Sequence, residues 1–197
     1  MQLQKTYAMT ESLTATHFRA HQQVVEAALG ELSGRVEEVA RVMVNALRSG
    51  GKVLAFGNGG SATQASHLAG ELVGRFAESR MPLPAIALAS DPGTVTCIAN
   101  DFGFANLFER QVQALAQSGD IAIGFTASGR SENVVRGLAA AKARGATTIV
   151  LMGAAGLVNG SADYLLAVPS ASTAHVQELH LMILHALCIH IEREFTK

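Results

Sequence analysis

The chain has 197 residues, of which 49% are hydrophobic and 16% charged, and its formal net charge is −1. This length suits one domain, and a near-neutral charge disfavours direct binding of nucleic acid, since no general positive field meets the phosphates. No apolar run is long enough to span a membrane, and the N-terminus lacks an apolar signal core, so we expect a cytoplasmic protein. Cys97 and Cys188 lie in apolar sequence without CxxC spacing, which predicts buried thiols in a reducing compartment.

Helical periodicity opens the chain, and short apolar runs alternating with helical stretches follow it. The expected N-terminal helices cover 10–29 and 33–47. The continuous apolar runs predict buried strands over 52–56, 84–89, 120–125, 147–152 and 164–168. Helical stretches between most of them cover 62–76, 107–116 and 131–144. This alternation predicts an α/β fold with right-handed crossovers and a parallel sheet covered on both faces.

A long helix is expected over 174–194, and its apolar residues go nearly all the way round. A helix that ends a small domain is buried so thoroughly only where a second chain covers it. The sequence therefore predicts an oligomer.

The loops that follow the first and third expected strands are candidate ligand sites, because ligands bind beyond the carboxyl ends of parallel strands. The first is Gly57-Asn58-Gly59-Gly60-Ser61-Ala62, which opens a helix and suits an anion. It also matches the dinucleotide fingerprint G-x-G-x-x-A weakly, but the best acidic partner, Asp91, lies too far along the chain. A tight turn without a ligand is the third interpretation.

The second loop is Thr126-Ala127-Ser128-Gly129-Arg130-Ser131, which also opens a helix. Three hydroxyls around a glycine at a helix N-terminus can hold a phosphate monoester without a Walker lysine. The alternative is a simple N-cap by Ser131, with the other hydroxyls solvated. A cap needs only one hydroxyl, which favours the phosphate cradle.

His67 and Glu71 are four residues apart, so both side chains leave one face of the expected helix and can meet one metal or substrate. A solvated ion pair is the alternative. On the last helix, Gln177 and His185 can converge only by leaning toward each other. Four histidines recur there at a spacing that prevents a shared face, so at most two belong to one site (His175, His180, His185, His190).

These features together resemble a known family. The two loops, the His67-x-x-x-Glu71 pair, the segment 99–104 (Ala-Asn-Asp-Phe-Gly-Phe) and the segment 177–185 are similar to the sugar isomerase (SIS) domain, and within it to the phosphoheptose isomerase family. The resemblance covers essentially the whole chain. It implies a single SIS domain over 1–197: a three-layer, flavodoxin-like sandwich with a five-stranded parallel sheet. A helical pair over 1–50 would pack on the core and on neighbouring subunits of a homotetramer.

The family's functional positions fall on residues of this chain. Its substrate-contacting positions correspond to Asn58, Gly59, Gly60, Arg75, Asn100, Asp101, Thr126, Ala127, Ser128, Ser131 and Gln177. Its metal positions, which typically hold one zinc ion per subunit, correspond to His67, Glu71, Gln177 and His185. The chain departs from the family pattern at Thr126, Ala127, Arg130 and Ala174.

The resemblance implies an aldose-ketose isomerase that converts sedoheptulose 7-phosphate to D-glycero-D-manno-heptose 7-phosphate through an enediol. This would be the first step of ADP-heptose synthesis for lipopolysaccharide. Glu71 would remove the carbon-bound proton, and His185 would act as the acid.

Three alternatives remain at this stage. One is a non-catalytic SIS protein that binds the replication initiator, although as we understand that branch it lacks the Glu and His found here at 71 and 185. Another is an isomerase of a different sugar phosphate, such as arabinose 5-phosphate. The third is a nicotinamide enzyme.

Overall fold

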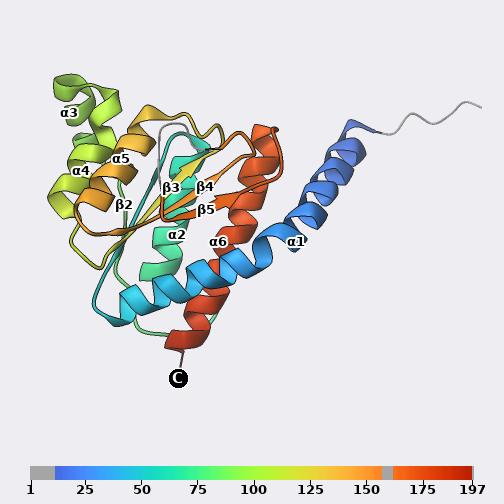
Figure 1. Cartoon of the computed structure of the whole chain (residues 1–197), viewed down its shortest axis with the longest axis horizontal. Coiled ribbons are helices and arrows are strands. Elements are labelled where there is room, and N and C mark those ends of the chain that lie inside the picture. Colours follow the sequence, from blue (N-terminus) through green and yellow to red (C-terminus); the bar gives the residue numbers. More distant parts are fainter. Residues whose placement is uncertain (1–11, 157–161, 197) are drawn as a thin grey trace, which may run out of the picture.

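The computed structural model describes residues 12–156 and 162–196, and it forms a three-layer α/β sandwich (Figure 1). The helices are α1 (Leu13–Arg48), α2 (Gly60–Val73), α3 (Pro92–Phe102), α4 (Leu107–Leu115), α5 (Glu132–Ala143) and α6 (Thr173–Phe195), with a short 3-10 helix, η1 (Phe104–Asn106). The strands are β1 (Val53–Gly57), β2 (Ala85–Ala87), β3 (Ile121–Thr126), β4 (Thr147–Met152) and β5 (Tyr164–Ala167). The expected fold class is confirmed.

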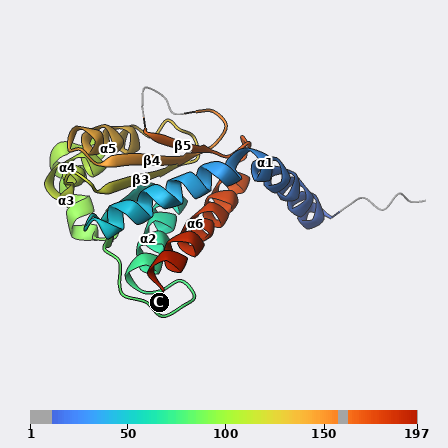
Figure 2. The ribbon, with the colours of Figure 1, turned by 60° about the horizontal axis from the view of Figure 1, so that its bottom comes forward.

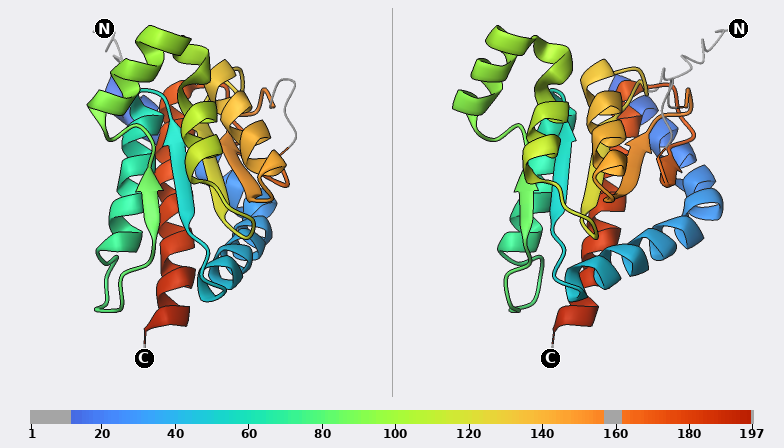
Figure 3. Two further views of the ribbon diagram at one scale, coloured as in Figure 1. Left: turned by 90° about the vertical axis from the view of Figure 1, so that its left-hand side faces the viewer. Right: turned by 60° about the vertical axis from the view of Figure 1, so that its left-hand side comes forward.

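The sheet is parallel throughout, in the order β2-β1-β3-β4-β5. The central strands β1, β3 and β4 are buried almost throughout, as continuous apolar runs indicate, whereas the edge strands β2 and β5 are partly exposed. Along β1, Val53 and Ala55 join the core formed with α1, α2 and α6, while Leu54 and Phe56 join the core formed with α4 and α5. Figure 3 shows the two helical layers on opposite sides of the sheet. The strand order reverses at β1 and β3, where ligands bind in sheets of this order.

The two helices expected over 10–29 and 33–47 form one continuous helix, α1, so the predicted pair is wrong; positions 10 and 11 lie outside the described residues. Gly30 and Gly34 are exposed, with open space around each. Glycine costs a helix only about 1 kcal/mol relative to alanine, which a long helix packed on a core absorbs. The Ser33 hydroxyl donates to the Leu29 carbonyl one turn earlier, so it too stays within the helix.

Helix α6 lies between α1 and α2, as Figure 2 shows. Its buried side includes Leu179, Leu184 and Leu187, whereas Met182 and Ile189 are 46% and 56% exposed. The expected burial on several sides therefore holds for most of the helix, and an apolar strip remains open. None of the helices in 12–156 and 162–196 is both long and apolar enough to cross a membrane.

Two local expectations are wrong. Residues 92–102 form α3, a helix that the sequence analysis omitted, and Cys97 on it is exposed rather than buried. Asp91 caps this helix by accepting from the Gly93 N–H, and Pro92 occupies the first turn; this Asp-Pro pair is a start signal. Cys188 is buried as expected, and burial raises the pKa of its thiol to about 12.

Candidate active site

The two expected ligand loops lie side by side because β1 and β3 are paired neighbours, with Gly57 opposite Phe125. Asn58 in the first loop and Asn133 in α5 exchange two amide hydrogen bonds, each of 2.8 Å. Asn133 is 3% exposed. No sequence motif marks Asn133, whose buried amide joins the two loops into one surface.

The glycines of the first loop are required by close packing and by backbone conformation. A Cβ on Gly57 would lie 2.7 Å from the Ser61 Cβ and 2.8 Å from the Phe125 carbonyl oxygen. Gly59 has φ 55° and ψ −124°, which side-chain-bearing residues rarely adopt. The Gln177 amide lies against Gly60, because a Cβ there would be 3.0 Å from both of its polar atoms. The loop thus leaves its backbone open to a ligand.

The second loop places its hydroxyls around the N-terminus of α5. The Thr126 hydroxyl is 3.3 Å from the Ser131 hydroxyl and accepts from the Gly129 N–H, while the Ser128 hydroxyl accepts from the Arg130 N–H. Ser131 occupies the N-cap position, yet its side chain makes no capping hydrogen bond. The simple-cap interpretation of Ser131 is therefore wrong, and the N-terminal N–H groups of α5 remain available to an anion.

Three of the four expected metal and catalytic residues converge: His67 and Glu71 from α2, and His185 from α6. The His67 Nε2 is 2.9 Å from the Glu71 Oε1, and the His185 Nε2 is 3.4 Å from the His67 Nε2. One potential ligand atom from each residue lies within 4.8 Å of the others. The His67 and Glu71 side chains are 39% and 20% exposed, so the cluster is reachable from solvent.

The donor set of this cluster fits a zinc ion. When the His67 Nε2–H donates to Glu71, that nitrogen has no lone pair with which to accept from His185, so the 3.4 Å approach of the His185 Nε2 is not a hydrogen bond. Two ligands on a tetrahedral zinc ion are about 3.3 Å apart, close to the separation seen here. Two imidazoles and one carboxylate, with a further position open, are the ligands of many zinc enzymes.

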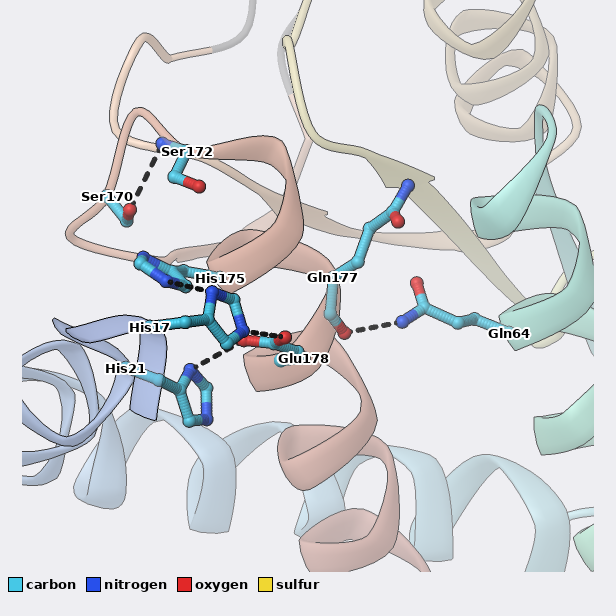
Figure 4. A network of polar contacts seen from close by, with 8 residues as sticks. All are labelled: His17, His21, Gln64, Ser170, Ser172, His175, Gln177 and Glu178. Atoms are coloured by element: carbon cyan, nitrogen blue, oxygen red, sulfur yellow. Dashed lines mark hydrogen bonds and ion pairs between the residues drawn. The ribbon is translucent and has the colours of Figure 1, made fainter. Parts of the chain in front are cut away.

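Gln177 lies near the start of α6. Figure 4 shows its side chain leaving α6 on the side opposite to Glu178, while its backbone carbonyl accepts from the Gln64 Nε2 at 2.6 Å. Its amide thus borders the first loop through Gly60. Its assignment as a metal ligand stays a prediction.

The remaining expected site residues lie on separate elements. Asn100 and Asp101 lie on α3, where the Asn100 amide donates to the Asp101 carboxylate. Ala127 contributes a backbone carbonyl that accepts from the Gly153 N–H. Arg75 follows α2, and its guanidinium donates to the Ala77 carbonyl. Their roles in substrate binding stay predictions.

A support beneath the cluster was missed from the sequence. The Phe76 ring lies 5.5 Å from the His185 ring, centroid to centroid. Glu192 of α6 is 6% exposed and accepts from the backbone N–H groups of Phe76 and Ala77. Arg80 donates to the Glu71 and Leu72 carbonyls at the end of α2. No sequence motif marks these contacts, since they depend on how α6 packs against the segment after α2.

Comparison with known proteins agrees with this geometry. The family model described as "SIS domain" matches residues 16–153. The phosphoheptose isomerase of Aquifex aeolicus is 49% identical over 89% of this chain and 92% of that protein. The structure of phosphoheptose isomerase GmhA from Neisseria gonorrhoeae superposes with a TM-score of 0.84 at 38% identity, covering 91% of this chain and 97% of that one. A phosphoheptose isomerase from Francisella tularensis gives a TM-score of 0.86 at 36% identity, over 90% and 95% of the two chains.

The fold and the cluster define an enzyme of the sugar-phosphate isomerase class. The chain belongs to the SIS domain family, and within it to the phosphoheptose isomerases.

Proposed function

We propose that this enzyme converts sedoheptulose 7-phosphate to D-glycero-D-manno-heptose 7-phosphate, the first step of ADP-heptose synthesis for lipopolysaccharide, in the cytoplasm. The convergence of His67, Glu71 and His185, on α6 and on the helix that the first anion-accepting loop opens, carries the proposal. Aldose-ketose isomerisation needs a base, an acid and a binding site for the phosphate, and the chain offers candidates for all three.

The phosphate of the substrate would sit on the second loop. Ser131 has a side chain free of capping contacts, and the α5 N-terminus offers backbone N–H groups together with the positive end of the helix dipole. A near-neutral protein can therefore hold an anionic sugar. The sugar chain would then extend past Asn58 and Gly60 toward His67.

The reaction moves one proton between adjacent carbons. Glu71 would take the proton bound to C1 of the ketose while His185 donates a proton to the C2 carbonyl oxygen, which yields the enediol. Returning a proton to C2 and removing one from the C1 hydroxyl then gives the aldose, so the enzyme ends as it began. The Phe76 ring would keep the His185 imidazole in place during these transfers.

Zinc, one ion per subunit, would be held by His67, Glu71 and His185, with Gln177 as the proposed fourth ligand. When bound, it would order the site or polarise the sugar carbonyl. A carboxylate that binds zinc is a weaker base, so Glu71 would serve best when the ion is displaced or remains structural.

A homotetramer is the proposed assembly. The groove between α1 and α6 is lined by apolar side chains, among them Leu29, Leu32 and Met182. Leu29 is 71% exposed and Met182 is 46% exposed. Apolar surface of this kind, on the two helices predicted to face neighbouring subunits, supports the proposal.

The test incubates the purified enzyme with sedoheptulose 7-phosphate, with and without a chelator, and detects the aldose product. We expect turnover that falls on chelation and returns with zinc. Arabinose 5-phosphate in a parallel reaction should react at least tenfold more slowly. Preferred turnover of the pentose, or binding of the replication initiator without any isomerisation, would assign the chain to another branch of the family. A rise in melting temperature with NAD would favour the nicotinamide alternative.

A further inference from the structure

A second group of histidines and one glutamate joins the start of α1 to the start of α6, away from the residues assigned to isomerisation. His17 and His21 lie one turn apart on α1, and His175 and Glu178 lie one turn apart on α6. Figure 4 shows the four side chains pointing toward one another, on the side of α6 opposite to Gln177. Each helix thus presents two potential metal ligands on one face.

The distances within this histidine–glutamate cluster are short enough for its side chains to bind one common ion. The His17 Nε2 is 2.8 Å from the Glu178 Oε1, and the His175 Nε2 is 3.3 Å from the His17 Nδ1. The His21 Nδ1 is 3.0 Å from the Glu178 Oε2. One ligand atom from each of His17, His175 and Glu178 lies within 4.8 Å of the others, and the His21 ring lies 5.8 Å from the His175 ring.

Hydrogen bonds account for only part of this arrangement. His175 can donate to His17, and His17 can donate to Glu178, which uses the available proton on each ring. The His21 Nδ1 and the Glu178 Oε2 are both screened from solvent, and despite their short separation they lack the alignment of a hydrogen bond. A buried polar atom left in this state is costly, and a cation between the two would satisfy both.

We propose that His17, His21, His175 and Glu178 form a second metal site, which takes a divalent transition-metal ion such as Zn²⁺. Three imidazoles and one carboxylate suit zinc and its neighbours, whereas calcium and magnesium prefer oxygen ligands alone. Four protein ligands would close the coordination sphere, as in structural zinc sites. The His67 cluster differs in its donor set, because the residues that converge there supply two imidazoles and one carboxylate.

The proposed ion would fix the beginning of α1 onto the body of the protein. The buried residues of α1 begin at Ala28, so the first four turns of the helix have no buried side chain in the described chain. Leu13 and Phe18 are 91% and 67% exposed. The histidine–glutamate cluster is therefore a polar contact that ties these turns to α6, in addition to the apolar packing of Val24 and Val25, and a metal ion there would strengthen it.

The test counts zinc bound per chain after chelator treatment, reloading with Zn²⁺ and desalting. The variant His17→Gln with His175→Gln removes two proposed ligands, while His67→Gln with His185→Gln disables the isomerase cluster. His190→Gln is the matched control, since His190 lies on α6 outside both clusters. We expect the first variant to bind one zinc equivalent fewer than the parent, and the control to match the parent. This difference does not depend on whether the isomerase cluster holds a metal.

Two further measurements use the His67→Gln, His185→Gln background. Zn²⁺ should raise its melting temperature, and Co²⁺ should give the visible absorption of a tetrahedral nitrogen–oxygen site. Adding His17→Gln and His175→Gln should abolish both effects while leaving the melting temperature in chelator within a few degrees. Equal zinc content in the parent and the His17, His175 variant, or an equal zinc-induced shift in both backgrounds, would show that the cluster is held by hydrogen bonds alone.

Discussion

Glu192 offers the most informative perturbation of the site, because it acts on the cluster without belonging to it. Glu192 is 6% exposed as a residue, and its Oε1 accepts from the Phe76 N–H at 3.2 Å and from the Ala77 N–H at 3.0 Å. The segment so held carries the ring that packs on His185. Glu192→Ala removes both acceptors, while Glu192→Gln keeps one amide oxygen in place.

The expected loss of stability follows from the two N–H donors that Glu192 accepts from. A hydrogen bond to a charged group contributes about 1.5 to 3 kcal/mol, and water can replace part of the loss because Ala77 is exposed. We therefore expect Glu192→Ala to lower the free energy of unfolding by about 3 kcal/mol, and Glu192→Gln by about 1 kcal/mol. Since Phe76 then loses its anchor, kcat of the alanine variant should fall about tenfold, a change worth about 1.4 kcal/mol.

Urea unfolding at fixed protein concentration measures the free energy of unfolding, and isomerase kinetics below the unfolding transition measure kcat. Thr196, whose hydroxyl bonds only the Glu192 backbone carbonyl, provides a control through Thr196→Ala, which should leave kcat unchanged. The reasoning fails if Glu192→Ala costs less than about 1 kcal/mol, or if the glutamine and alanine variants behave alike.

Three further predictions concern the loops and the core. Ser131→Ala should raise KM about tenfold through the loss of one hydrogen bond to phosphate, with the melting temperature unchanged because the side chain caps nothing; a destabilised variant would contradict this. Gly57→Ala should lower the free energy of unfolding in urea by about 2 kcal/mol or more, because the new Cβ would meet Ser61 and the Phe125 carbonyl. An unchanged free energy of unfolding would contradict this, since it would require β1 and β3 to move apart without cost. Burial lowers the pKa of His180 from its ordinary 6.5 to about 4. The unfolded chain therefore binds more protons between these values and stability falls as the pH drops, so His180→Leu should remove roughly 3 kcal/mol of that acid dependence; an unchanged pH profile of unfolding would refute the assignment.

The sheet and the two ligand loops could be predicted because their signals are local. Continuous apolar runs mark buried parallel strands, and glycines or hydroxyls at their ends mark the loops. The edge strand was the exception: 84–89 was expected as a buried strand, whereas β2 covers Ala85–Ala87 and Ile86 is 39% exposed. Composition alone does not distinguish an edge strand from a central one, because the sequence of a strand does not say which strands lie beside it.

The candidate site was predicted where spacing on one helix decided it, and was missed where packing between elements decided it. His67 and Glu71 share a helix face, so their approach follows from sequence. The Asn58–Asn133 amide pair and the contact of Glu192 with the Phe76 segment join residues far apart in the chain. The single helix α1 was also missed: the expected helices covered 10–29 and 33–47, whereas tertiary packing carries one helix through Gly30 and Gly34.

In the proposed reaction Glu71 moves the carbon-bound proton of a heptulose phosphate, and a single substitution tests this role. Glu71→Gln preserves the size of the side chain and a contact to His67 while removing the base. Turnover of sedoheptulose 7-phosphate should fall at least a thousandfold with an unchanged melting temperature, in line with the contribution of a general base of about 10² to 10⁴. The matched control Glu78→Gln, at an exposed position just beyond α2, should keep full activity. If the Glu71→Gln enzyme retains the activity of the parent, the proton is transferred by another group and the proposed mechanism is wrong.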